Sequence, residues 1–157
     1  MTIGDHAETV QIEYDPAVTD FPTLLSLFWS NHEPTAQRKA QYKSAIFYHD
    51  NDQKEWAEKT LVEQERIRAK KVYTKIEPAE RFYDAEDYHQ KYMLQQNSKL
   101  CKSLKASGLK DFKTSHVATR LNGYIGGYGT LENFLVESEK LGLTDEQVAI
   151  VKLSLRK

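Results

Sequence analysis

Three short clusters of polar and aromatic side chains carry the groups with which this chain could do chemistry. Glu8 opens an alternating segment, and its carboxylic acid could serve there as a proton donor. The hydroxyl of Tyr42, just before an apolar stretch, could donate a hydrogen bond to a ligand oxygen. Residues 82–92 combine carboxylates, aromatic rings and a histidine, with Glu86 and His89 at helical spacing. Proton transfer and the binding of an oxygen atom are the chemistry that these residue types suggest.

Each cluster also has a structural interpretation that involves no ligand. An isolated glutamate is most often a solvated surface charge, and a tyrosine that enters a strand is often an edge residue. Carboxylates at a helix start are favoured by the helix dipole. The acidic groups around His89 suggest a metal site, but the sequence shows no second compact cluster of ligands. We therefore predict that no metal is bound.

The composition is that of one ordinary globular chain of 157 residues, with 39% apolar and 29% charged residues. Its formal net charge of -1 gives no general attraction for nucleic acid, and no apolar run approaches the ~20 residues of a membrane span. The single cysteine, Cys101, excludes an internal disulfide and a cysteine-rich zinc site. With no secretory signal in its first residues, the chain is predicted to be cytoplasmic, or mitochondrial in a longer form, without nucleic-acid or membrane partners.

The first half of the chain alternates between strand and helix patterns. Apolar residues alternate over residues 8–14, which predicts a half-buried strand that ends before Pro16. Thr19 or Asp20 is a suitable cap for a helix that runs to about residue 31. Three further segments complete the pattern: a buried strand over residues 43–49, a helix over 53–69 and a strand over 72–76. This order predicts a layered α/β or α+β domain.

The second half is predicted to be helical apart from one loop. Helices are expected over residues 85–94 and 100–106, the second of them ended by Gly108. Residues 122–129 hold four of the seven glycines and are predicted to form a loop. The last two helices are expected over residues 131–141 and from a capping box, Thr144 with Gln147, to about residue 155.

Four sequence blocks in residues 4–93 resemble, in the same order, those of the A-type peptide methionine sulfoxide reductases. Residues 4–16, GDHAETVQIEYDP, resemble the family's G-H-A-E-x-V and Y-D-P block. Residues 24–35, LLSLFWSNHEPT, resemble L-L-x-x-F-W-x-N-H-D-P-T. The last two blocks are residues 41–46, QYKSAI, similar to Q-Y-R-S-A-I, and residues 82–93, FYDAEDYHQKYM, similar to F-Y-x-A-E-x-x-H-Q-x-Y-L.

The resemblance implies the reduction of methionine-S-sulfoxide, free or in proteins, to methionine, which repairs oxidative damage. In the family, the glutamate of G-H-A-E protonates the sulfoxide oxygen and matches Glu8, and the tyrosine of Q-Y-R-S holds that oxygen and matches Tyr42. A thiolate supplies the electrons, so no cofactor is expected to be bound, and thioredoxin or another thiol is the expected reductant. Four more residues are expected to contact the substrate: His6, Asp87, His89 and Tyr92.

The resemblance also implies a fold. The expected class is α+β, a ferredoxin-like two-layer sheet with helices that lacks its first strand-helix unit and carries extra C-terminal helices. The reductase core would occupy residues 1–95, and residues 96–157 would form a helical extension packed on the same domain. The protein is expected to be a monomer.

One feature of the family has no counterpart in the sequence, namely its nucleophilic cysteine. That cysteine lies in a G-C-F-W-G motif before G-H-A-E, so we expect an N-terminally truncated member of the family. Ile125 stands where the family's G-Y-C-G has a resolving cysteine. Cys101 matches no catalytic motif; it is a structural cysteine, with a pKa slightly lowered by nearby lysines, or a resolving thiol in a longer form. The chain alone is therefore expected to be inactive, at most a binding module.

Overall fold

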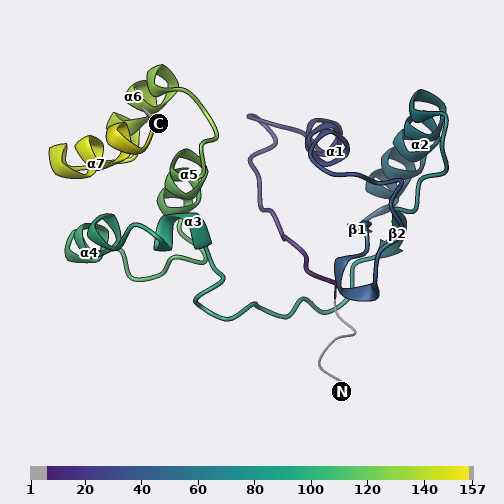
Figure 1. The fold of residues 1–157 in the computed structure, drawn as a ribbon, viewed down its shortest axis with the longest axis horizontal. Helices are drawn as coiled ribbons and strands as arrows, with labels where there is room; N and C mark the ends of the chain where they lie inside the picture. Colours follow the sequence, from purple (N-terminus) through teal and green to yellow (C-terminus); the bar gives the residue numbers. More distant parts are fainter. Residues whose placement is uncertain (1–6, 156–157) are drawn as a thin grey trace. The chain divides into compact units, whose positions relative to one another are not determined.

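The computed structural model describes residues 7–155, and it divides the chain into two compact units, Met1–Phe82 and Tyr83–Lys157 (Figure 1). His6, one of the expected substrate contacts, lies outside the described residues. The division falls between Phe82 and Tyr83 in the sequence; the reductase core over residues 1–95 with an extension over residues 96–157 stays a prediction. We describe each unit by itself.

The first unit is built around a strand–helix–strand crossover. Two short strands pair in parallel, with Ala45 opposite Lys75, and the helix between them makes the connection that parallel strands require. Asp20 and Asp50 cap the two helices, since their carboxylates accept hydrogen bonds of 2.8 Å from the amides of Thr23 and Gln53. The elements of this unit are α1 (Phe21–Ser30), the 3-10 turn η1 (Ala40–Tyr42), β1 (Ala45–Tyr48), α2 (Asn51–Arg68) and β2 (Lys75–Pro78).

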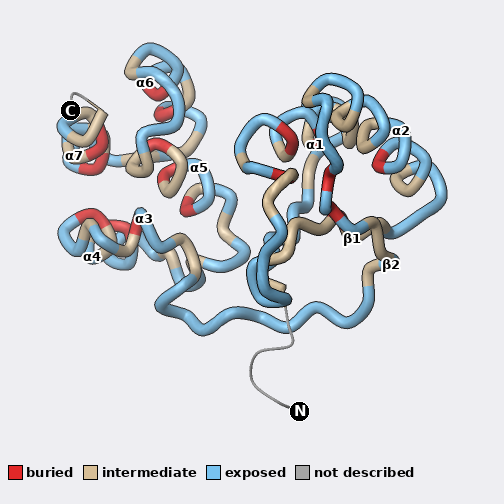
Figure 2. Tube along the Cα trace, turned by 45° about the vertical axis from the view of Figure 1, so that its right-hand side comes forward, coloured by how far each residue is buried: buried red, intermediate tan, exposed pale blue. Residues whose placement is uncertain are grey.

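A small apolar core holds α1, α2 and the strands together (Figure 2). Trp29 of α1 and Ala57 of α2 are buried in it with Ile46 of β1. Arg68 Nη2 donates a 2.8 Å hydrogen bond to the carbonyl oxygen of Trp29, which ties the end of α2 to the end of α1. The predicted helices over residues 22–31 and 53–69 and the strand over 43–49 are therefore confirmed within a few residues.

One strand prediction in this unit is wrong, and another is shifted along the chain. Residues 8–14 form no strand, because alternation makes a strand only where a neighbour completes the ladder, and the only described ladder joins β1 and β2. Val10, expected on the buried face, is 80% exposed. The predicted strand over residues 72–76 begins later, at Lys75, and Val72 is buried in the core just before it.

The second unit is helical. A buried cluster that includes Leu94, Leu121 and Phe134 forms its core. The capping box is present: the amide of Thr144 donates to Gln147 Oε1 at 3.0 Å, and the amide of Gln147 donates to Thr144 Oγ1 at 3.3 Å. The elements are α3 (Tyr92–Gln95), α4 (Ser98–Ala106), α5 (His116–Ile125), α6 (Leu131–Lys140) and α7 (Asp145–Leu155).

The structure corrects the prediction of a loop over residues 122–129. Residues 122–125 are the last turn of α5, a helix that the sequence analysis did not identify. The glycine count obscured the helical spacing of Leu121 and Tyr124, both of which are buried. The chain leaves the helix only after Ile125, at Gly126 and Gly127.

The predicted helix over residues 85–94 is also wrong. Residues 80–89 are all exposed, so no apolar face exists to support a helix there. Residues 87–91 form turns, and Lys91 adopts a left-handed conformation with φ of 51° before α3 begins at Tyr92.

The described residues thus form seven α-helices and a two-stranded parallel sheet, which confirms a mixed α+β class. No helix in this part of the chain combines the length and apolar character that crossing a membrane requires.

Gly129 should be the least replaceable glycine of the helical unit. Its φ is 97°, and a Cβ there would lie 2.8 Å from Cε1 of Tyr124, a buried ring whose hydroxyl is bonded to Glu137. Gly108 has a similar φ of 96° but open space around it. Gly108→Ala should cost about 1 kcal/mol of unfolding free energy, and Gly129→Ala a further ~1–3 kcal/mol from the clash. Urea denaturation followed by circular dichroism measures both, and equal losses would contradict the packing argument.

Candidate functional site

The structure brings Glu8 to the turn that carries Tyr42. The amide of Glu8 donates to the carbonyl oxygen of Gln41 at 3.0 Å, and Gln41 Nε2 donates to Glu8 Oε1 at 3.1 Å. Tyr42 is the last residue of η1 and is 54% exposed, so its hydroxyl is accessible to a ligand. The carboxyl and the phenol that the sequence singled out therefore belong to one local structure, joined through Gln41.

A partly buried chain of hydrogen bonds holds the segment just after this turn. His32 Nδ1 lies 2.6 Å from the carbonyl oxygen of Phe28, and His32 Nε2 lies 2.7 Å from Ser44 Oγ. Ser44 Oγ in turn lies 2.7 Å from Thr74 Oγ1, whose residue is buried. Since a carbonyl oxygen can only accept, Nδ1 must carry the proton of the neutral ring, and Ser44 then donates to Nε2. The chain links α1 with the starts of both strands.

An ion pair holds the residue between Tyr42 and Ser44. Lys43 Nζ donates to Glu77 Oε2 at 2.7 Å, from one strand segment to the other. This hydrogen bond keeps the pKa of the Glu77 carboxyl below its ordinary value. The pair and the histidine chain together fix the backbone that follows the turn.

The other predicted contacts lie in the helical unit, and all three are exposed. His89 Nε2 lies 3.8 Å from Glu86 Oε2, which confirms that these two side chains meet. The carbonyl oxygen of Asp87 accepts a 2.6 Å hydrogen bond from Gln95 Nε2, while Tyr92 begins α3. Among residues 7–155, no group of three or more histidine, cysteine or carboxylate side chains is arranged to hold a metal ion.

The single cysteine is placed poorly for nucleophilic attack. Cys101 is half-buried on α4, and its thiol donates a 3.3 Å hydrogen bond to the carbonyl oxygen of Leu94. Burial raises the pKa of this thiol, and the opposing effect of Lys105 is smaller. Lys105 does lower the pKa of this thiol, as expected, but burial outweighs it, so the predicted net lowering is wrong. A raised pKa reduces the thiolate fraction, and the thiolate is the reactive form.

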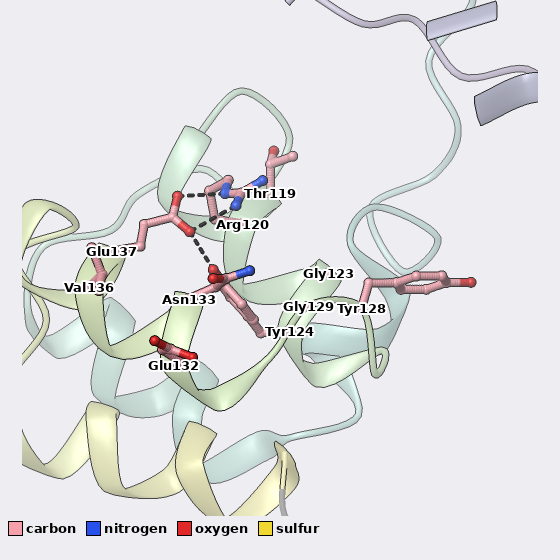
Figure 3. Close-up of a pocket in the computed structure, with 10 residues that line it drawn as sticks. All are labelled: Thr119, Arg120, Gly123, Tyr124, Tyr128, Gly129, Glu132, Asn133, Val136 and Glu137. Atoms are coloured by element: carbon pink, nitrogen blue, oxygen red, sulfur yellow. Dashed lines mark hydrogen bonds and ion pairs between the residues drawn. The ribbon is translucent and has the colours of Figure 1, made fainter. Parts of the chain in front are cut away.

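The helical unit also contains a groove that the sequence did not predict (Figure 3). It has a volume of about 520 Å³ and lies along α5 and α6. On its wall, Arg120 Nε and Nη2 donate to the two carboxylate oxygens of Glu137 at 2.6 and 2.8 Å, and Tyr124 Oη donates to Oε2 at 2.6 Å. The charges of Arg120 and Glu137 neutralise each other. Because Arg120 and Tyr124 belong to α5 and Glu137 belongs to α6, these hydrogen bonds clamp the two helices together.

Comparison with known proteins identifies the family. Residues 2–121 match the sequence model of the family described as peptide methionine sulfoxide reductase. Residues 108–155 match the helical domain described for selenoprotein methionine sulfoxide reductase A. The chain therefore belongs to the peptide methionine sulfoxide reductase family.

Individual relatives agree with this assignment. A peptide methionine sulfoxide reductase of Drosophila melanogaster is 48% identical over 148 residues, which cover 92% of this chain and 60% of the relative. Another, from Solanum lycopersicum, is 40% identical over 114 residues, which cover 68% of this chain and 58% of the relative. A third, from Rhodopirellula baltica, is also 40% identical over 114 residues, 59% of its length. The chain thus spans about 60% of the length of these relatives.

His32 should carry its proton on Nδ1 when the ring is neutral, because the Phe28 carbonyl oxygen can only accept. Two-bond proton–nitrogen NMR of the imidazole distinguishes the two tautomers. Ser44→Ala should keep this tautomer and move the Nε2 signal, since Nε2 loses the hydroxyl that it contacts. A ring protonated on Nε2 in the native protein would show that the chain of hydrogen bonds is wrong.

The clamp between α5 and α6 should weaken in acid. Arg120, the main cause, lowers the pKa of Glu137 below its ordinary value. A carboxyl with a lowered folded-state pKa stabilises the protein above its unfolded-state pKa, and this contribution is lost as the pH falls through the folded-state value. Glu137→Gln should thus cost about 1 kcal/mol at pH 7 and progressively less as the pH falls through the lowered pKa of Glu137. The matched control is Glu139→Gln on the same helix, which should change stability little at pH 7 or in acid. A pH-independent cost for Glu137→Gln would contradict the ionic clamp.

Proposed function

We propose that this protein reduces methionine-S-sulfoxide, and that Glu8 and Tyr42 act on the sulfoxide oxygen. The observation that carries the proposal is the joining of the two residues through Gln41, in a chain that belongs to this family. Glu8 is exposed and Tyr42 is more than half exposed, so a sulfoxide can reach both. The carboxylic acid supplies the proton, and the phenol donates a hydrogen bond to the oxygen.

The chemistry requires a thiolate besides these two groups. The thiolate sulfur attacks the sulfoxide sulfur, and two electrons pass from the cysteine to the substrate. The oxygen takes a proton from Glu8, its bond to the substrate sulfur breaks, and it is transferred as a hydroxyl group to the cysteine sulfur. The products are methionine and a cysteine sulfenic acid. A second thiol then forms a disulfide with that cysteine and releases water, and a dithiol such as thioredoxin reduces the disulfide.

Cys101 does not supply this thiolate in our proposal. Its raised pKa and its hydrogen bond to Leu94 favour the neutral thiol, and its position matches no catalytic motif of the family. We assign the nucleophile to the family's G-C-F-W-G segment, which precedes the G-H-A-E block and would complete a ferredoxin-like sheet. Residues 1–157 alone should therefore bind the oxygen side of the substrate without turnover.

The remaining site residues complete the proposal. Asp87, His89 and Tyr92 contact the substrate or orient its contacts, and their exposed side chains are available for this. His6, two residues before Glu8 in the sequence, is assigned the same role from the family resemblance. A reducing compartment such as the cytoplasm suits the thiol chemistry.

An activity assay tests the proposal directly. With methionine-S-sulfoxide and dithiothreitol, residues 1–157 should show no turnover, and Cys101→Ser should change nothing. A fusion that places a family G-C-F-W-G segment before Met1 should reduce the substrate. In that fusion, Glu8→Gln should lower kcat by ~100-fold or more, as expected for loss of a general acid, and Tyr42→Phe by ~10-fold or more, as for loss of an oxygen-binding donor.

The control is Tyr73→Phe, which removes another exposed phenol of the same unit and should leave kcat unchanged. Turnover by residues 1–157 that disappears with Cys101→Ser would make Cys101 the nucleophile and overturn its exclusion. A fusion whose kcat is insensitive to Glu8→Gln would overturn the role of the acid.

A further inference from the structure

We propose that Gln41 is a positioning residue that orients the Glu8 carboxylic acid for proton transfer, an inference that rests on the proposed function. Two contacts carry it. The main chain of Glu8 is bonded to the Gln41 carbonyl at 3.0 Å, and the side chain of Gln41 reaches Glu8 Oε1 at 3.1 Å. One residue therefore holds both the backbone and the functional group of the acid.

The side-chain contact selects the oxygen that carries the proton. A protonated carboxyl has one carbonyl-type oxygen, which accepts, and one hydroxyl oxygen, which donates. The Gln41 amide donates to Oε1, so Oε1 is the accepting oxygen and the acidic proton resides on Oε2. Oε2 is then the oxygen that would donate the proton to a substrate.

The charge of the side chain that contacts the Glu8 carboxyl matters as much as the position of that side chain. A cation beside Glu8 would favour the carboxylate more strongly than the neutral amide of Gln41 does, and would therefore oppose proton donation more. Lys43 stands only two residues beyond Gln41, but its ammonium group is bound to Glu77 at 2.7 Å. The turn thus presents an amide to the acid, while Lys43 is bound to the carboxylate of Glu77.

The position of Gln41 is itself held from both sides. Gln41 is the middle residue of η1, and the amide of Tyr42 closes that turn by donating to the Lys39 carbonyl oxygen at 2.9 Å. Beyond the turn, Ser44 is bound to His32 and Thr74. The acid is therefore oriented by a residue whose backbone is anchored to the sheet, and not by its own segment, which has no ladder partner among the described residues.

The contact is tested first on the 157-residue chain by NMR. The side-chain amide signals of Gln41 should shift in Glu8→Gln, while those of Gln37, an exposed glutamine of the same segment, should not. Gln41 signals that are unchanged in this variant would overturn the proposal, because the amide would then not contact the carboxyl in solution.

Turnover of the G-C-F-W-G fusion tests the orientation. Gln41→Leu, which cannot donate, should lower kcat by ~10-fold with KM within about twofold of the native value, the pattern of a loss confined to the transition state. Gln41→Arg keeps a donor but adds a charge, so kcat should fall here as well. Gln37→Leu is the matched control and should keep native kcat.

The outcomes separate this inference from the function on which it rests. Native kcat in Gln41→Leu, together with a loss in Glu8→Gln, would overturn the positioning role and leave the acid in place. Full activity in Gln41→Arg would show that a charged donor serves as well as the neutral amide. Gln41 would then only hold the segment in place, and the proposal would be overturned. If the fusion shows no turnover with native Glu8, the proposed function fails, and the NMR contact still decides whether Gln41 holds the carboxyl.

Discussion

The parallel pairing of β1 with β2 is the constraint on which the first unit depends. Its register places Ala45 opposite Lys75, so the preceding residues, Ser44 and Thr74, also face each other. Their hydroxyls meet at 2.7 Å, and Ser44 can then receive the ring of His32 from α1. A slip of one residue would turn these side chains to opposite faces and remove every one of these bonds. The register of two short strands thus decides where the turn before β1 lies.

The placement of Glu8 follows from that turn. Its own segment has the alternation of a strand but no described ladder, so backbone pairing within the segment cannot fix it. Instead, the described hydrogen bonds that reach Glu8 from elsewhere both come from Gln41. Such bonds are individually worth about 1 kcal/mol, and two from one residue orient a group more firmly than either alone. The sheet therefore positions Glu8 indirectly, through the turn that carries Gln41.

Local signals predicted much of this structure, and long-range pairing accounts for the rest. The carboxylate caps and apolar stripes that predicted α1 and α2 act within one or two helical turns, so they can be recognised from neighbouring residues in the sequence. The failed strand over residues 8–14 depends on a neighbour that no local pattern reveals. Motif matching found Glu8 and Tyr42, whereas the hydrogen bond from Gln41 to Glu8 spans 33 positions and had no sequence signal. Helix α5 was missed because the glycines outweighed the helical spacing of its buried residues Ala118, Leu121 and Tyr124.

Sulfoxide reduction makes opposite demands on its nucleophilic thiol and on its general acid. Cys101 does not meet the demand on the thiol. The nucleophile must lose its proton easily, which requires a polar or cationic environment, while the acid must keep its proton until the oxygen can take it. The surroundings of Cys101, a helix packed on an apolar core, raise its pKa and so oppose the first demand. Glu8 lies in different surroundings, on an exposed turn beside the side-chain amide of Gln41. A thiolate that works with Glu8 must therefore come from a different environment from that of Cys101, and the family's G-C-F-W-G segment is where we place it.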